Sequence, residues 1–312
     1  MIKYIVKRVL LIYLIVLVII FILFLLLYAL PASLVRSMPI YGGGDALDSV
    51  FSFFNAGDNF FTKYIRYCYN VIVRFNFGYT VSSSRRLAME LSARLRTTLT
   101  ILACGVGATL LIGVPLGAYS AVHKNSKRDR IINVVTLFFS AIPSYTIAFL
   151  LVVIFSLYLG LVPVLSSYAS PVAYFLPTLT ITLGGVALIS RTTRTSMLEI
   201  LEQPFITALR SKGLKERHVV YRHAFKSALI TILSVLGGLI AQMLCGTFVV
   251  ELFFNVPGLG SYMLRSVGFR DHIEMLGCTV IMAIVLATTN IIADVAYTFV
   301  NPQIRLRYTR GS

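Results

Sequence analysis

Long uncharged stretches alternate with short charged segments along most of the chain. Four uncharged runs cover residues 9–30, 97–122, 228–250 and 275–293, and a fifth, of 60 residues, covers 131–190. A helix needs about 20 apolar residues to cross a membrane, so the longest run can hold two spans joined by a hairpin, GLVPVLSSYASP. The pattern therefore predicts an all-α polytopic membrane protein with six transmembrane helices.

The basic residues predict which ends of these spans face the cytoplasm. Residues 1–8, 123–130, 191–227 and 301–312 hold 3, 4, 8 and 3 of them, which is 18 of the 28 Lys and Arg residues. Cytoplasmic loops carry an excess of Lys and Arg, so both termini are expected to be cytoplasmic. The arginines between 85 and 96 fall on the opposite side, but long loops follow this rule poorly.

This topology divides the chain into four parts. Residues 1–30 are expected to form an N-terminal anchor helix, because the uncharged run exceeds the roughly 7–15 apolar residues of a signal peptide. Residues 31–90 form an external segment whose many aromatic side chains suit either a ligand or the membrane interface. Residues 91–300 form the transmembrane core, with the cytoplasmic loop 191–227, and residues 301–312 form a cytoplasmic tail.

Composition excludes several classes of function. The chain is 57% hydrophobic with a net charge of +16, and the basic residues flank spans, which indicates contacts with anionic lipid and not with nucleic acid. The four cysteines and four histidines are scattered, so neither a disulfide framework nor a metal site is expected. The sequence holds no phosphate-binding loop ending in Gly-Lys-Ser/Thr and no catalytic motif, so we expect no cofactor and no catalytic residue.

Small residues and prolines within the spans predict how the helices pack and bend. Glycines allow close helix–helix approach in lipid, and the spans carry several: Gly105, Gly107, Gly113, Gly117, Gly184, Gly185, Gly237, Gly238 and Gly246. Three prolines, Pro115, Pro143 and Pro177, are expected to kink or break their helices.

The loop 191–227 contains the pattern of a short, capped helix. Pro204 stands where a helix begins, and Gly213 stands just past where it ends. If Gly213 adopts the left-handed conformation, Leu214 lies beside Leu209, the contact that accompanies a Schellman ending.

One face of this short helix is apolar and is surrounded by basic residues. Phe205, Ala208 and Leu209 share that face at i, i+3, i+4 spacing. A folded apolar face that stands off the membrane predicts a docking site for a protein. The candidate docking residues are Glu202, Pro204, Phe205, Ala208, Leu209, Arg210, Lys212, Gly213 and Leu214.

The loop resembles the coupling segment of ATP-binding-cassette (ABC) importer permeases, in which Glu-Ala-Ala is followed after three residues by Gly. Ala208 and Gly213 match the pattern, whereas Thr207 and Leu209 replace its Glu and its last Ala. Further matching segments cover most of residues 90–308, and within this superfamily they resemble the first permease of oligopeptide, dipeptide and nickel importers. These segments are ELSARLRTTLTI, IGVPLGAYSAVHKNSKRDRII, LGLVPV, LPTLTITLGGVALISRTTRTSMLEIL, VVELFFNVPGLGSYMLRSVGFRDH and DVAYTFVNPQIRLRY.

The chain departs from the pattern of that family at several positions. The stretch LPASLVRSMPIYGGGD lacks the Gly-Asp-Pro that often follows the first span. Val256 replaces a usual Trp, Asn301 a usual Asp, and Thr231 the Pro that often ends the coupling segment. These differences bear on the substrate more than on the fold.

The resemblance implies a type I ABC importer permease in a prokaryotic cell membrane. Its implied partners are a second homologous permease subunit, two cytoplasmic ABC ATPases and an extracytoplasmic substrate-binding protein. The helix 204–212 would insert Phe205, Ala208 and Leu209 into a groove on one ATPase, and Gly213 would set the angle of the basic stretch that follows. Closure of the ATPases around ATP would then rock the spans between inward-open and outward-open states.

Several alternatives remain open at this stage. Peptides are the expected cargo because the chain shows no dense His or Cys cluster, but nickel, a metal chelate or glutathione fits the same architecture. An ion-coupled carrier could use Asp294, the one acid within a span, although such carriers usually have more such groups and broken helices in matching halves. The loop could also be a solvated basic connector at the lipid headgroups.

Overall fold

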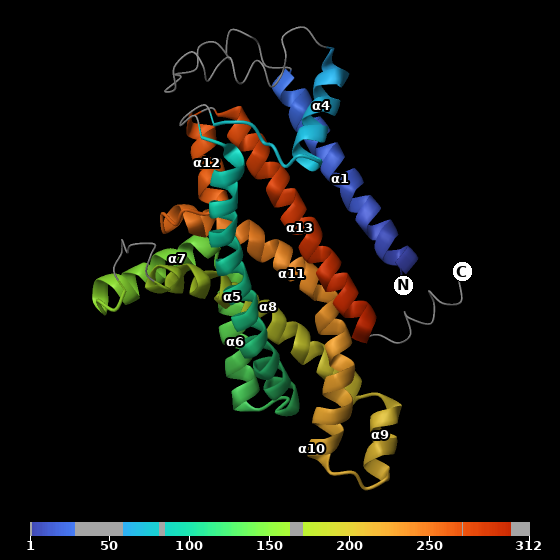
Figure 1. Ribbon diagram of the computed structural model, residues 1–312. Helices are drawn as coiled ribbons and strands as arrows, with labels where there is room; N and C mark the ends of the chain where they lie inside the picture. The colour runs from blue at the N-terminus through green and yellow to red at the C-terminus, as the bar shows by residue number, and fades with distance from the viewer. Residues whose placement is uncertain (1, 29–58, 81–84, 163–170, 270, 301–312) are drawn as a thin grey trace. The chain divides into compact units, whose positions relative to one another are not determined.

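The computed structural model describes residues 2–28, 59–80, 85–162, 171–269 and 271–300 (Figure 1). Within these ranges the regular structure is helical apart from one isolated bridge between Tyr79 and Arg86, which confirms the predicted all-α class for this part of the chain. The predictions for residues 31–58, for most of the hairpin after the third span and for the tail 301–312 lie outside the described residues.

The chain folds into two compact units. The first is built mainly from residues 100–254 and includes the end of α13 from Thr289 onward. Besides that end and most of α5 (Leu87–Val122), its elements are α6 (Lys127–Ala141), α7 (Ser144–Leu151), η1 (Val152–Tyr158), η2 (Pro171–Tyr174), α8 (Phe175–Leu201), α9 (Pro204–Ser211), α10 (Glu216–His218), η3 (Val219–Ala224) and α11 (Phe225–Phe253). Helix α8 is central to this unit, since it packs against α6, α7 and α11.

The second unit contains residues 5–99 and 255–288. Its elements are α1 (Ile2–Tyr28), α4 (Phe60–Ile72), the start of α5, α12 (Leu259–Phe269) and most of α13 (His272–Val300). The backbone N–H of Leu259 donates to Thr98 Oγ1 over 2.9 Å, which satisfies an amide at the start of α12. A Cβ at Gly277 would lie 2.8 Å from the Leu87 side chain, so α13 and α5 meet closely there.

Within the described residues, four helices are long and apolar enough to cross a membrane, namely Leu87–Val122, Pro171–Leu201, Glu216–Phe253 and Ile273–Tyr297. A pair of helices, Lys127–Ala141 and Ser144–Tyr158, makes a fifth span if it is counted as one. The apolar part of α1 found among the described residues, Tyr13–Leu25, is shorter than a full span. The count of six spans and the cytoplasmic placement of both termini therefore remain predictions.

The three prolines differ in their effects. The two helices on either side of Pro143 are bent by 106°, because Ile142 is extended and Pro143 starts a new helix as its N-cap. By contrast, α5 continues through Pro115, and Pro177 lies in the first turn of α8, where a missing N–H costs no helical bond. The prediction of a helix break is thus confirmed at Pro143 and was wrong at Pro177.

Small residues bring α5 and α8 into close contact within the first unit. A Cβ at Gly117 would collide with the carbonyl oxygen of Ser190 and lie 2.7 Å from Thr193 Cβ. A Cβ at Gly185 would lie 2.6 Å from Thr109 Oγ1, so the contact is repeated two turns away along the same pair. The predicted close approach is confirmed at these positions, whereas a Cβ at Gly107 would meet nothing within 4 Å.

This difference predicts opposite effects of the same substitution on one helix. Gly117→Ala should destabilise the protein by about 1–3 kcal/mol, because the obstacle is backbone and cannot move aside. Gly107→Ala should be neutral or stabilising by up to about 1 kcal/mol, because alanine has the higher helix propensity. Thermal unfolding in detergent measures both, and equal midpoints for the two variants would refute the close contact.

Candidate functional site

Helix α9 has the boundaries that its proline and glycine predict. It begins at Pro204 after an extended Gln203 and ends at Ser211, with Lys212 as its C-cap. Gly213 follows with a φ of +78°, and its N–H donates to the Arg210 carbonyl oxygen over 2.9 Å. This bond joins the residue after the cap to the last turn, as in a Schellman ending.

One face of α9 is anchored to the rest of the first unit. Ile206 is fully buried and forms a small core with Val219 and Ala224 of η3. Leu209, which we assigned to the docking face, packs against this core beside Ile200 and Leu201. Ile206 was not among the predicted docking residues, although its i, i+3 spacing to Leu209 indicates an apolar pair on one helix face.

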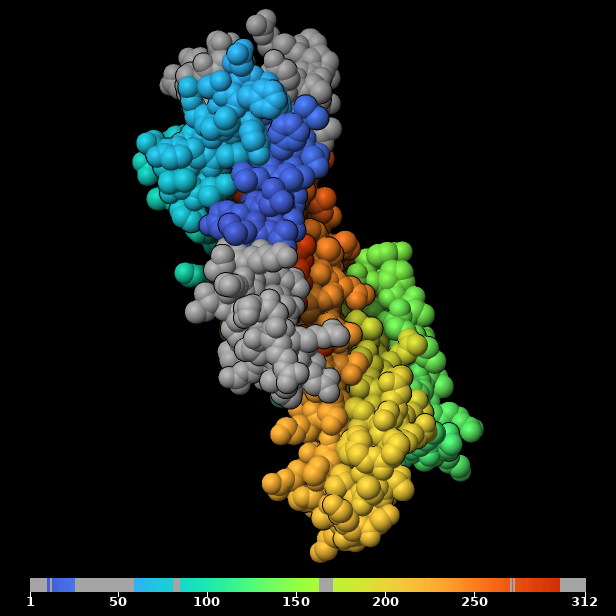
Figure 2. Space-filling view, turned by 90° about the vertical axis from the view of Figure 1, so that its right-hand side faces the viewer, coloured from blue at the N-terminus to red at the C-terminus, as the bar shows by residue number. Residues whose placement is uncertain are grey.

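The rest of the α9 surface is exposed. Phe205 keeps 46% of its surface accessible, and Ala208 beside it is also exposed. Pro204, Arg210 and Lys212 are exposed around them. The segment projects beyond the ends of α8 and α11 in Figure 1, and its surface is open in Figure 2 (yellow). An exposed phenylalanine on a short helix with a fixed base is suited to a protein contact.

Two ion pairs shape the loop around α9. Arg210 donates to both carboxylate oxygens of Glu216, over 3.0 and 2.6 Å, and so closes the turn that contains Gly213 and the exposed Leu214.

The second ion pair connects the 123–126 turn to the end of α8: Lys124 Nζ lies 2.8 Å from Glu202 Oε1. That hydrogen bond holds the pKa of the Glu202 carboxyl below its usual value. Both pairs are exposed, so they orient the loop more than they stabilise it.

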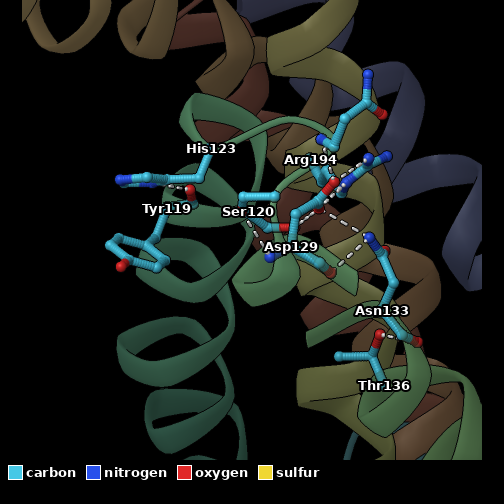
Figure 3. Close-up of polar contacts among 9 residues, drawn as sticks. Tyr119, Ser120, His123, Asp129, Asn133, Thr136 and Arg194 are labelled. Atoms are coloured by element: carbon cyan, nitrogen blue, oxygen red, sulfur yellow. Dashed lines mark hydrogen bonds and ion pairs between the residues drawn. The ribbon is translucent and has the colours of Figure 1, made fainter. Parts of the chain in front are cut away.

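A buried carboxylate joins the helices that precede α9 (Figure 3). Asp129, near the start of α6, accepts hydrogen bonds from Arg194 Nε and Nη2 of α8 over 2.7 and 2.9 Å. Ser120 of α5 donates to the same carboxylate over 2.5 Å, and Asn133 donates over 2.8 Å. The Asn125 N–H donates over 3.0 Å. The Asp129 carboxylate therefore links three helices, α5, α6 and α8.

An apolar path continues from α9 into these helices. Ile200 and Leu201 at the end of α8 contact both the core around Ile206 and a second core. The second core contains Ala118, Ala121, Met197, Val220 and Ala228, from α5, α8, η3 and α11. Because packed interiors deform little, a displacement of α9 should move the ends of these helices with it.

Gly213 gives a local test of this arrangement. Its φ lies in the left-handed region, which costs other residues about 1–2 kcal/mol, so Gly213→Ala should loosen the loop. Gly213→Pro should loosen it further, because proline fixes φ near −65° and removes the N–H that reaches Arg210. Tryptic cleavage after Arg210, Lys215 and Arg217 should accelerate by roughly 5–30-fold for a change of this size; the bond after Lys212 is left out because trypsin does not cut before proline.

The control for this prediction is Gly107→Ala, where a Cβ would meet nothing within 4 Å. Cleavage of the loop in that variant should match the unmodified chain. If Gly213→Pro is cleaved at the unmodified rate, the capped geometry of α9 is wrong.

Comparisons with known proteins show the family to which the chain is related. A family model described as "Binding-protein-dependent transport system inner membrane component" matches residues 113–306. The dipeptide transport system permease protein DppB of Bacillus subtilis is 30% identical over 256 residues, which cover 82% of each chain. The glutathione transport system permease protein GsiC of Pectobacterium atrosepticum is 30% identical over 236 residues, or 76% of this chain and 77% of that one.

A solved structure shares the fold. A chain of the MetNI methionine ABC transporter, in an inward-facing conformation, aligns with a TM-score of 0.57 at 17% identity. The alignment covers 68% of this chain and 97% of that one. The family match and the apolar helices together confirm the resemblance deduced from the loop and its neighbouring segments. The chain belongs to the family of inner-membrane components of binding-protein-dependent transport systems, and it is a multi-pass membrane protein of a prokaryotic cell.

Proposed function

We propose that the chain is a permease subunit of an ATP-driven importer and that α9 docks into one of its ATPases. The observation that carries this proposal is the two-sided character of α9. Phe205 and Ala208 are exposed, while Ile206 anchors the same short helix to α8 and η3. A connector loop at the headgroups would have no need of this fixed base.

The proposed assembly has five parts in total. This chain and a second homologous permease form the two halves of a translocation pathway, two cytoplasmic ABC ATPases supply the energy, and an extracytoplasmic binding protein delivers the substrate. The absence of a phosphate-binding loop in the sequence supports a separate ATPase. We place both termini and the 191–227 loop in the cytoplasm, in agreement with the bias of basic residues.

Within this assembly α9 transmits movement of the ATPases to the transmembrane helices. When the ATPases close around ATP, the groove that holds Phe205 moves, and α9 moves with it. The packing of Ile206 and the second core transmit this movement to the ends of α5, α8 and α11. The subunit then changes between its two states because the nucleotide state of a partner favours one of them.

Peptides are the proposed cargo. The relatives are named as dipeptide, glutathione and putative peptide permeases, and glutathione is itself a small peptide. Their names favour a peptide backbone as the shared chemical feature over a bare metal ion such as nickel. Nickel, a metal chelate and glutathione itself are outcomes that the following experiment separates.

The test is uptake by the reconstituted complex in proteoliposomes with ATP inside and the binding protein outside. We expect accumulation of a labelled dipeptide or oligopeptide that stops when ATP is omitted. Parallel assays with glutathione, with free nickel and with a nickel chelate identify the alternative cargoes. Uptake that persists without ATP under an ion gradient, and that Asp294→Asn abolishes, would contradict the proposal and indicate an ion-coupled carrier.

A further inference from the structure

Helix α4 lies in the external segment 31–90, and it packs on the first span. Its ring pairs with α1 have centroid distances of 5.8 Å for Phe21–Phe60, 5.4 Å for Phe21–Tyr64 and 6.0 Å for Phe24–Tyr67. These distances are in the range that stabilises aromatic pairs. The two helices lie side by side in Figures 1 and 2, where α1 is dark blue and α4 is light blue.

The depth of this contact is informative. The Tyr64 hydroxyl donates to the carbonyl oxygen of Leu17 over 2.9 Å. Leu17 is eleven residues before the end of α1 at Tyr28, which is roughly 16 Å along a helix axis. The hydrocarbon core of a bilayer is about 30 Å thick, so a span that uses this apolar run places Leu17 well inside it. Tyr64 must then reach into the membrane.

The surface of α4 has three arcs. Tyr67, Cys68 and Val71 are buried on the first arc, the side of the ring pairs with α1. The second arc is apolar but exposed: Phe61 is 67%, Ile65 64% and Tyr69 48% accessible. These three residues recur at i, i+4, i+8 and form a continuous stripe.

The third arc of α4 is polar. It carries Thr62, Lys63, Arg66 and Asn70. Helices with Lys and Arg on one face and large apolar residues on the other lie in the boundary between headgroups and acyl chains. Helix α1 covers only part of the apolar surface of α4. The Arg74 guanidinium lies 5.1 Å from the centroid of the Tyr69 ring at one end of the stripe, so Phe61, Ile65 and the rest of Tyr69 need another covering.

We propose that lipid covers this stripe, so that α4 is embedded beside α1 in the leaflet at the C-terminal end of α1. Three observations support lipid over a protein. The contact with Leu17 sets the depth, and α1 itself exposes Val18, Ile22 and Leu25 at that level, as lipid-facing positions do. The Lys63 and Arg66 arc is suited to the phosphates of the headgroups, because long basic side chains extend toward the interface. With the N-terminus in the cytoplasm, this is the outer leaflet.

The inference does not depend on the proposed function or on the cargo. It gives the external segment a structural role: α4 would brace the first span from the lipid side. An aromatic stripe that was instead a ligand site or a binding-protein contact would be exposed to water in the isolated chain. The two possibilities therefore differ in a quantity that can be measured directly.

The chain contains no tryptophan, so a single introduced Trp reports on its own surroundings. We suggest Phe61→Trp and Tyr69→Trp as stripe variants, with Lys63→Trp and Asn70→Trp as controls on the polar arc of the same helix. Each full-length variant is placed in lipid nanodiscs. Emission is then quenched either by bromine on the lipid acyl chains or by iodide in the buffer, with the unmodified chain as the blank.

The stripe variants should emit further to the blue than the controls. Bromolipid should quench them roughly twofold or more above the controls, because the stripe then lies among the acyl chains. Iodide should quench the controls more strongly. The proposal is overturned if iodide quenches Phe61→Trp and Tyr69→Trp as strongly as Lys63→Trp. It is also overturned if they become protected only when the binding protein is added, which would identify a protein contact.

Discussion

Replacing Phe205 by aspartate should leave the permease in the membrane but separate transport from ATP hydrolysis. Phe205 is exposed on α9, and its neighbour Ile206 holds the helix in place, so the change should not unfold the loop. A buried aromatic at the centre of an interface contributes about 2 kcal/mol or more to binding. A loss of that size weakens ATPase binding roughly 30-fold. An unpaired carboxylate in an apolar groove weakens it further.

The measurement combines co-purification with transport. We expect the Phe205→Asp variant to reach the membrane at the unmodified level, to lose most of its bound ATPase and to show little ATP-driven uptake. Tyr221→Asp is the matched control, because Tyr221 is an exposed aromatic residue of the same loop but lies on η3, outside α9. If Phe205→Asp retains its ATPase and transports at the native rate, the docking assignment is wrong.

Replacing Asp129 by asparagine should cause the largest loss of stability among the polar substitutions considered. The Asp129 and Arg194 side chains are 5% and 23% accessible, so the substitution leaves a largely desolvated guanidinium without its countercharge. Breaking a buried pair in this way costs about 3–5 kcal/mol, and the partial exposure of Arg194 favours the lower end. At about 2–4 °C per kcal/mol, the unfolding midpoint should fall by roughly 6–12 °C.

A double-mutant cycle separates the pair from its surroundings. Asp129→Asn with Arg194→Gln should be less destabilising than the sum of the single changes, with a coupling of about 1–3 kcal/mol. Lys124→Ala is the control. It also breaks an ion pair in this region, but both partners, Lys124 and Glu202, are exposed, so the loss of stability should be small. Strictly additive single effects would show that Asp129 does not act through Arg194.

Loss of the Asp129 network should also impair coupling. Arg194 lies two turns before the end of α8 at Leu201, and α9 begins three residues after that end. If α8 is no longer tied to α5 and α6, movement of α9 can be absorbed locally. We therefore expect ATP hydrolysis without proportionate transport in any Asp129→Asn complex that remains assembled.

Local sequence chemistry explains which features could be predicted. The limits of α9 follow from Pro204 and Gly213, whose backbone preferences act within a few residues. The spans follow from the uncharged runs. The break before Pro143 follows from proline geometry, whereas Pro177 was misjudged because the N-terminal boundary of α8 was not known.

Other features depend on contacts between distant parts of the chain. Asp129 and Arg194 are 65 residues apart, and the basic residues near them had been interpreted as topology signals alone. The burial of Ile206 depends on η3, which follows it in the sequence and folds back on it. Helix α4 is a different case, because its aromatic residues recur with helical spacing and a helix could have been predicted from that period.

The central claim is that the exposed face of α9 touches an ATPase, and a photo-crosslink tests it most directly. Benzoylphenylalanine is placed at position 205, at position 208 or, as a control, at the exposed position 221, in the assembled complex. We predict crosslinks to the ATPase from 205 and 208 that strengthen or weaken with the nucleotide state, and none from 221. Equal crosslinking from all three positions, or crosslinks from 205 and 208 to lipid alone, would contradict the account.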